Sequence, residues 1–408
     1  LHTVSNLQAA SEAAVRRSER EADAANTLRL PEVSLNYTRV YGTKTGSLET
    51  PIGAIPIDLD LDGPRPSINS TWALYTGGQI SATQRALSAH VDQARAELAG
   101  TSQHLDLELT QVYFGVVLAA NVERTRMQQL DVADRQLARA MRFEQQGIIP
   151  RVERLSAQVS RDEAARELVR AKSDRQIADA RLQRLLQTDT PVEPTTPLFV
   201  ITHALDELPN WLATAERQNP ILSALGARQA QAEQGVVLAK SLWKPNVFAF
   251  GSYSLNDKYH TLVEPDWIAG IGVNFTLLSR VKRSGKVGAA EEELTQVQSL
   301  QEESRNVIDT AVETSYRKVE QAREQFQLLE SALAATHENL RLRERGFDEG
   351  QATSLDVNDA RDSVARAETA RALSAYEFVV ALAQLLEASG QAHALPDYIQ
   401  RADERLPP

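Results

Sequence analysis

The stretch from Phe347 to Ala360, Phe-Asp-Glu-Gly-Gln-Ala-Thr-Ser-Leu-Asp-Val-Asn-Asp-Ala, predicts a tight turn between two antiparallel helices. Gly350 can adopt the positive φ that ends a helix. Thr353 or Ser354 can cap the helix that follows, and Asp356 falls in its first turn, where a carboxylate interacts favourably with the helix dipole. Long helical patterns flank the turn, so this stretch predicts a helical hairpin.

A similar turn occurs in the first half of the chain, where residues 143–157 read Phe-Glu-Gln-Gln-Gly-Ile-Ile-Pro-Arg-Val-Glu-Arg-Leu-Ser-Ala. When the two turns are aligned, the matching pairs are Gly147 with Gly350, Pro150 with Thr353, and Glu153 with Asp356. Recurrence of one pattern in both halves is typical of a duplicated architecture. We therefore expect two structural repeats, at residues 1–203 and 204–408.

Each repeat is expected to contain two strands, one long helix and a shorter returning helix. Alternation of apolar and polar residues predicts the strands, at about 33–41, 68–75, 247–255 and 267–277. Apolar residues at 3/4 spacing predict the helices, at about 81–144, 151–186, 285–347 and 355–388. The segment between Gly42 and Pro66 is rich in Gly, Pro, Thr and Asp, and we expect a long loop there.

The third of these helices decides the fold class. Neither Pro nor Gly occurs between Ala289 and Arg345. A helix of about 60 residues would be roughly 90 Å long, far beyond the usual length in a globular domain. The fold class is therefore mainly α, with a smaller β portion.

Composition excludes several classes of protein. The chain of 408 residues has no Cys, so disulfides, thiolate metal sites and a Cys nucleophile are excluded. Its net charge of −11 argues against a nucleic-acid partner. The seven His residues lack metal-ligand spacing, and nothing aligns a catalytic triad. We expect no metal, no cofactor and no enzymatic activity. No apolar run reaches the roughly 18 residues of a spanning helix, and the start at Leu1 suggests a trimmed N-terminus.

The predicted strands have the length and alternation of a transmembrane barrel wall, with lipid on one side and water on the other. Four strands are too few to close a barrel, since the smallest have about 8. Several chains would therefore have to contribute. Aromatic residues are expected to mark the membrane boundary, namely Tyr37, Trp72, Trp267 and Phe275. The alternative is a non-membrane coiled-coil structural protein whose strands form a small β-sandwich.

The order of these elements and two motifs, Trp72-Ala-Leu-Tyr-Thr-Gly-Gly78 and the turn at 347–360, resemble the TolC family of outer-membrane efflux proteins. The resemblance covers essentially the whole chain. It implies a homotrimer, in which a twelve-stranded β-barrel in the outer membrane continues as an α-helical barrel through the periplasm. It also implies docking on a periplasmic adaptor and an inner-membrane pump, and passive export of drugs, metals or proteins.

The resemblance also implies functional residues. The Leu-Asp-Val-x-Asp-Ala pattern implies that Asp356 and Asp359 form a lumen-facing ring at the periplasmic tip, whereas helix capping is the alternative role. Both turns are expected to form the gate and the adaptor-docking tips, through Gly147, Pro150, Glu153, Phe347, Gly350 and Thr353. The family's gate also uses a Tyr, an Arg and a Thr-Asp pair. This chain has Phe347, Ala352 and Val152-Glu153 there, so a polar latch of the family's form is not expected.

Overall fold

The computed structural model describes residues 1–60, 62–256 and 265–406, and the chain divides into two compact units. The first unit, here called the helical unit, comprises Leu1–Ala13, Ala96–Ser223 and Glu302–Pro408. The second, the strand unit, comprises Ala14–Arg95 and Ala224–Gln301. Two long helices, α2 (Gln79–Gln145) and α6 (Arg283–Asp348), contribute residues to both units.

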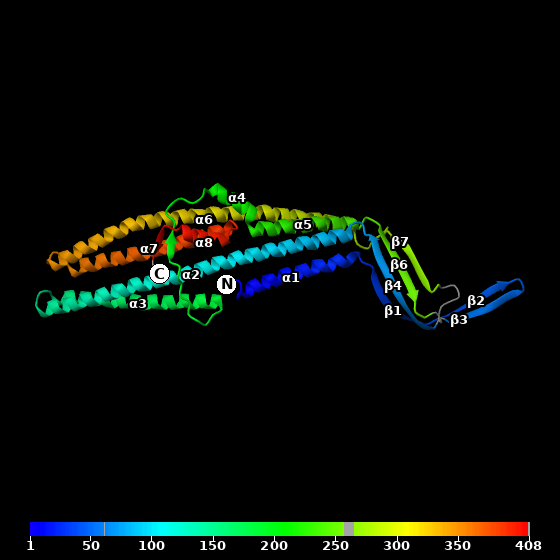
Figure 1. Ribbon diagram of the computed structural model, residues 1–408, viewed down its shortest axis with the longest axis horizontal. Coiled ribbons are helices and arrows are strands. Elements are labelled where there is room, and N and C mark those ends of the chain that lie inside the picture. The colour runs from blue at the N-terminus through cyan, green and yellow to red at the C-terminus, as the bar shows by residue number, and fades with distance from the viewer. Residues whose placement is uncertain (61, 257–264, 407–408) are drawn as a thin grey trace. The chain divides into compact units, whose positions relative to one another are not determined.

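The helical unit contains two helical hairpins (Figure 1). In one hairpin α2 is followed by α3 (Arg151–Leu186), and in the other α6 is followed by α7 (Ser354–Ala388). These bounds lie within two residues of the helices expected from the sequence. Both turns contain a glycine with positive φ, 71° at Gly147 and 75° at Gly350. An L-residue is strained in this conformation, which explains why glycine ends each long helix.

Three aromatic rings join the two hairpins in the core of the helical unit. The ring of Phe199 contacts Phe114 on α2 and Phe378 on α7, with centroid distances of 5.8 Å and 6.3 Å and nearly perpendicular planes. Phe199 lies in β5 (Leu198–Val200), which pairs antiparallel with β8 (Glu404–Leu406). Three-residue strands are too short to show a period, so the sequence analysis did not predict this sheet.

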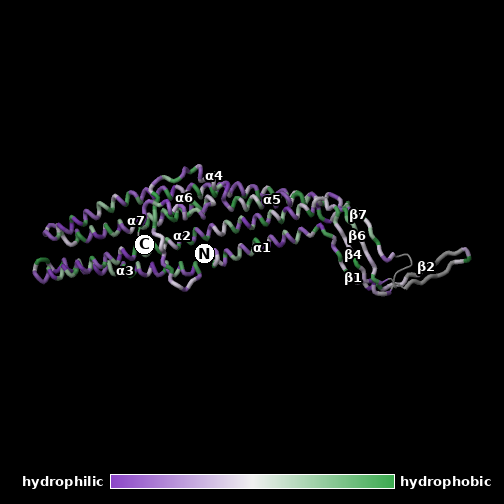
Figure 2. Tube along the Cα trace, viewed as in Figure 1, coloured by the Kyte–Doolittle hydropathy of each residue, from purple (hydrophilic) through white to green (hydrophobic). Residues whose placement is uncertain are grey.

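Shorter helices complete the chain. They are α1 (Asn6–Asn26), α4 (Leu208–Gln218), α5 (Pro220–Ser241), α8 (Leu395–Arg401) and the 3₁₀ turns η1 (Thr27–Arg29) and η2 (Ala392–Ala394). Figure 2 shows hydrophilic and hydrophobic residues alternating along the helices.

One expectation about helix hydropathy requires correction. Within the described residues, α2 contains an 18-residue window with mean hydropathy 1.2, enough by length and composition to cross a membrane. About 44% of that window is buried inside the protein. Phe114 and Val117 of α2 lie in the core of the helical unit. Burial in this core explains why α2 is apolar there.

The strand unit contains a four-stranded antiparallel sheet in the order β1-β4-β6-β7. Its strands are β1 (Glu32–Val40), β4 (Gly63–Tyr75), β6 (Asn246–Ser254) and β7 (Trp267–Asn274). β4 therefore begins before the expected position near residue 68, and β7 ends at Asn274, so Phe275 lies just beyond the sheet.

The prediction of a long loop between Gly42 and Pro66 is wrong, because most of this segment forms two strands. β2 (Thr43–Thr50) pairs with β3 (Gly53–Asp60) in the same register in which β1 pairs with β4. The four segments therefore form one long hairpin, with Gly53 at a φ of 131° beside its turn. Backbone pairing between the strands does not depend on side-chain composition, so the Gly and Pro content misled the sequence analysis.

The sheet has one apolar face, which is exposed. Directly paired residues of antiparallel strands point to the same side. By this rule the register groups the exposed residues Leu35, Tyr37, Ile68, Trp72, Tyr253, Trp267, Ile271 and Val273 on one side, here called the apolar face. The opposite face carries Ser34, Asn36, Ser67, Asn69, Ser252 and Asn274.

Apolar residues also occur on the polar face, namely Ile268, which pairs with Ser252, and two phenylalanines of β6. Phe248 pairs with Gly272, and Phe250 pairs with Gly270. Each ring covers its glycine, since a Cβ atom would lie 2.6 Å from the Phe248 ring at Gly272 and 3.0 Å from the Phe250 ring at Gly270. The two ring centroids are 6.1 Å apart.

Candidate functional site

The turn between α6 and α7 is fixed by a capping box. The Thr353 amide donates to the Asp356 carboxylate at 2.9 Å, and the Asp356 amide donates to the Thr353 hydroxyl oxygen at 3.2 Å. Arg343 on α6 lies 3.7 Å from the same carboxylate. The hydrogen bonds from the Thr353 backbone and hydroxyl, together with the charge of Arg343, lower the pKa of Asp356. Asp356 therefore caps α7 and remains ionised at neutral pH.

Asp359 lies in the same first helical turns of α7 and is exposed. The fold thus brings Asp356 and Asp359 to one end of α7, three residues apart, where both side chains can share a helix face. A ring of such carboxylates requires further copies of the chain, so the ring remains a prediction.

A third carboxylate near this turn was not predicted. Burial raises the pKa of Asp362 above its ordinary value, Arg366 opposes that rise, and Asp359 adds to it. Although the residue is exposed, protein atoms around its carboxyl group partly exclude water. Its position one helical turn after Asp359 is the signal that could have identified it.

The turn between α2 and α3 has no side-chain cap. Pro150 occupies the N-cap position of α3, and Glu153 lies in the first turn. The Ile148 amide donates to the Phe143 carbonyl at 2.8 Å and closes the end of α2 around Gly147. An ion pair of 2.7 Å between Glu144 on α2 and Arg154 on α3 holds the two helices together. In the other turn Phe347 is half-buried, and its carbonyl accepts a hydrogen bond from the Gly350 amide.

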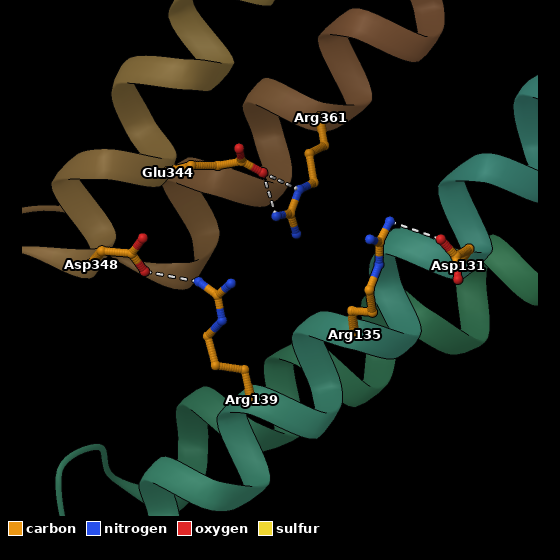
Figure 3. A network of polar contacts seen from close by, with 6 residues as sticks. All are labelled: Asp131, Arg135, Arg139, Glu344, Asp348 and Arg361. Carbon is orange, nitrogen blue, oxygen red and sulfur yellow. Dashed lines mark hydrogen bonds and ion pairs between the residues drawn. The ribbon is translucent and has the colours of Figure 1, made fainter.

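Near the turns, polar contacts join one hairpin to the other, and farther along α2 and α7 the Tyr376 hydroxyl donates to the Gln111 carbonyl at 3.3 Å and His104 lies 3.2 Å from Glu387. Figure 3 shows Arg139 extending from α2 to Asp348 on α6, with an Nη1–Oδ1 distance of 2.8 Å. The Asn358 amide on α7 donates to the Ser160 hydroxyl on α3 at 2.9 Å. Neighbouring charges pair within one hairpin, as Glu344 with Arg361, or within one helix, as Asp131 with Arg135. Helical periodicity does not reveal such links, and the sequence analysis missed them.

A cavity of about 370 Å³ lies between the same four helices. Residues from α2, α3, α6 and α7 line it, among them Gln136, Ser160, Glu344 and Asn358. Within the described ranges 1–60, 62–256 and 265–406, no group of three His, Cys, Asp or Glu side chains is placed to hold a metal ion.

Aromatic residues lie toward both ends of the apolar face. Trp267 pairs with Tyr253 at the end from which the β2–β3 hairpin extends. At the opposite end, where the strands meet the helices, Phe275 follows β7. The Trp72 indole donates to the Arg29 carbonyl at 2.8 Å, and the register places Trp72 in line with Ala249 and Ile271. An extended chain from Trp267 to Phe275 spans roughly 26 Å, at about 3.3 Å per residue.

Long helical hairpins and a sheet with an exposed apolar face define a class of outer-membrane channel proteins. The profile of the outer membrane efflux protein family matches residues 5–188 and 211–391. The chain belongs to this family.

Individual relatives agree with this assignment. The chain is 25% identical over 276 residues to protein CyaE of Bordetella pertussis, and 27% identical over 192 residues to the outer membrane efflux protein BepC of Brucella suis. These matches cover 64% and 47% of this chain, and 57% and 41% of the relatives. The chain thus spans about half the length of the curated relatives it matches.

The fold is also that of a solved channel. The structure of CusC, described as forming a transmembrane channel, is similar with a TM-score of 0.80 at 13% identity. The similarity covers 95% of this chain and 90% of CusC. The family match assigns the chain to the outer membrane, among transport proteins and not enzymes.

Proposed function

We propose that the chain forms a homotrimer that conducts substrates passively through the outer membrane. The exposed apolar face of the sheet is the observation that carries this proposal. Strands of outer-membrane barrels tilt by about 35–45°, so the roughly 26 Å between Trp267 and Phe275 would rise roughly 20 Å along the membrane normal, comparable with their apolar band of about 25 Å, which aromatic residues border. Tyr37, Trp72, Trp267 and Phe275 would then form the two girdles.

The open edges of the sheet support an assembly of several chains. Within the described sheet, β1 and β7 each pair with a neighbour on one side only. Unpaired strand edges cannot face lipid, because their backbone groups would have no hydrogen-bond partners. Pairing β7 of one chain with β1 of the next removes every edge. With three chains, the number that the family resemblance implies, the barrel would have twelve strands, and the helical hairpins would form the wall of a periplasmic α-helical barrel.

The turns would form the periplasmic end of the duct. Asp356 and Asp359 from each chain would make an acidic constriction, which favours cations. The tips at Gly147, Pro150, Glu153, Phe347, Gly350 and Thr353 would provide the gate and the adaptor-docking surface. Arg139 and Asp348 would restrain movement of one hairpin against the other.

Family membership supports the wider system. We propose that the duct receives its substrate from a periplasmic adaptor and an inner-membrane pump, in a tripartite efflux or type I secretion system. The chain would consist of two structural repeats, 1–203 and 204–408. The separate family matches at 5–188 and 211–391 are consistent with this division.

The alternative, a coiled-coil protein with a small β-sandwich, requires a second layer over the apolar face. Side chains on that face are exposed, for example Trp267 at 66% and Ile271 at 71%. A sandwich in water would bury them, so the exposure favours the membrane-spanning barrel.

The proposal is tested by measuring mass and conductance on one purified sample. Mass measurement in detergent should give a trimer, and the same sample should form ion-conducting pores in planar bilayers. A monomer would contradict the proposal. So would a trimer that never conducts, even after the ion pair between Arg139 and Asp348 is removed by substitution.

A further inference from the structure

The cavity between the two hairpins has features of a binding site. Its volume of about 370 Å³ falls within the range of small-molecule sites, roughly 300–1,000 Å³. All four long helices of the helical unit line it, so an occupant would touch both hairpins at once. Its apolar lining includes Val132, Ala164, Leu340 and Val364.

One wall of the cavity contains an unpartnered buried donor. Gln136 on α2 is only 5% exposed, and its Nε2 makes no hydrogen bond within the described part of the chain. The Nη1 of Arg361, on the α7 side of the cavity, is also buried without a partner. Buried polar atoms of native proteins normally find a partner. Both groups are N–H donors, so the missing partner is a hydrogen-bond acceptor.

The charge of the cavity indicates a second property of the occupant. Five lining residues are carboxylates, namely Glu163, Glu167, Glu344, Asp362 and Glu368, whereas two are guanidinium groups, Arg126 and Arg361. Arg361 is bound to Glu344 at 2.6 Å, Arg126 lies 3.9 Å from Glu167, and Glu163 pairs with Arg166 outside the cavity, which leaves Asp362 and Glu368 without an arginine partner among these ion pairs. The remaining negative charge attracts cations.

We propose that this cavity binds amphiphilic organic amines that carry an oxygen acceptor. The protonated amine would lie near Glu167 and Asp362, the oxygen would accept from the Gln136 amide, and the apolar body would contact the aliphatic side chains. Such an occupant links the two hairpins. The site goes beyond conduction, because its binding can be measured whether or not the pore is open.

A pair of fluorescent probes that differ in charge tests the proposal. Propranolol has a naphthyl body, ether and hydroxyl oxygens and a protonated amine, whereas 3-(1-naphthyloxy)-1,2-propanediol has a neutral hydroxyl group in place of the amine. With the protein in lipid nanodiscs, propranolol should bind one site per chain and at least tenfold more tightly than the diol. Equal affinities would overturn the proposal.

Variants identify the site. Glu167→Gln combined with Asp362→Asn should weaken propranolol binding at least tenfold and leave diol binding unchanged. Asp309→Asn combined with Glu313→Gln removes the same charge from exposed positions of α6 outside the cavity and should change neither. Equal loss in the two double variants would show attraction to net charge alone and would overturn the site.

Gln136→Leu separates binding from folding. It removes the unpartnered donor, so the variant should unfold at a temperature no lower than that of the wild type. It should nevertheless bind propranolol several-fold more weakly. Undiminished binding by this variant would overturn the assigned role of Gln136. Conductance measured on the same samples keeps this test distinct from that of the export function.

Discussion

Arg139 on α2 and Asp348 on α6 form a direct ion pair of 2.8 Å between the two helical hairpins (Figure 3). Both residues lie near the hairpin turns, within the last two turns of α2 and at the end of α6. The other charged residues drawn in Figure 3 pair within a hairpin, Glu344 with Arg361 and Asp131 with Arg135. The pair is therefore placed to resist separation of the hairpins at their tips.

Removing this pair should favour the open duct. Both side chains are partly exposed, so the pair contributes roughly 0.2–1 kcal/mol per chain. Asp348→Ala should raise single-channel conductance or open probability in planar bilayers. The exchange of Arg139→Asp with Asp348→Arg should return the wild-type value. Asp131→Ala, which breaks only the pair with Arg135 within α2, is the matched control. Equal conductance and open probability in Asp348→Ala and wild type would show that this ion pair does not hold the duct closed.

Substitutions along β7 should report the depth of the membrane. Ile271 lies midway between Trp267 and Phe275, so Ile271→Arg should destabilise the inserted protein by about 2–4 kcal/mol. Val273→Arg, which lies nearer the membrane boundary, should destabilise the inserted protein by a smaller amount. Asn274→Arg on the opposite face should be tolerated. Urea titration of protein folded into vesicles measures this series, and equal costs for Val273→Arg and Asn274→Arg would mean that the sheet faces are assigned wrongly.

The capping box should make the start of α7 sensitive to acid. Because the native contacts lower the pKa of Asp356, its stabilisation of the helix is present above the ordinary Asp pKa and is lost as pH falls through the native value. Hydrogen exchange of the peptide containing Thr353 and Asp356 should therefore lose protection below about pH 4, relative to an Asp356→Asn variant. Parallel pH profiles for the two proteins would contradict this role.

The roles of Asp356 in helix capping and of Asp359 in the pore lining should be separable by mutation. Asp359 is exposed and is not part of the capping box, so Asp359→Ala should leave α7 intact. If three copies line the constriction, this variant should weaken block by a multivalent cation such as hexamminecobalt added to the periplasmic side. The pore of Glu349→Ala, a variant at an exposed position in the same turn, should be blocked by the cation as strongly as the wild-type pore. Unchanged block in Asp359→Ala would remove it from the pore lining.

Local chemistry explains the parts of the fold that the sequence predicted well. Gly350 and Thr353 have few alternatives, because one ends a helix in the left-handed region and the other starts a helix with its hydroxyl. The long helices lack Pro and carry apolar residues at 3/4 spacing, so their bounds lie within two residues of the expected ones. Alternation along β7 similarly predicted the apolar face that the register defines.

Long-range features were missed for a physical reason. The ion pair between Arg139 and Asp348 joins helices far apart in the chain, and nothing in either local pattern selects that partner. The pairing of β5 with β8 and the cavity beside Gln136 likewise depend on how the hairpins pack. In β2 and β3, cross-strand backbone hydrogen bonds outweighed a composition that favours loops.

The two phenylalanines of β6 place a constraint on how the protein can change over time. Phe248 and Phe250 occupy the space that side chains at Gly272 and Gly270 would need. A larger residue at Gly272 requires the Phe248 ring to move or to be replaced by a smaller side chain, whereas at Gly270 a smaller shift of the Phe250 ring relieves the contact. Among natural relatives, Gly272 and Phe248 should therefore vary together more than Gly270 and Phe250, and a laboratory selection starting from Gly272→Ala should recover second-site changes at Phe248.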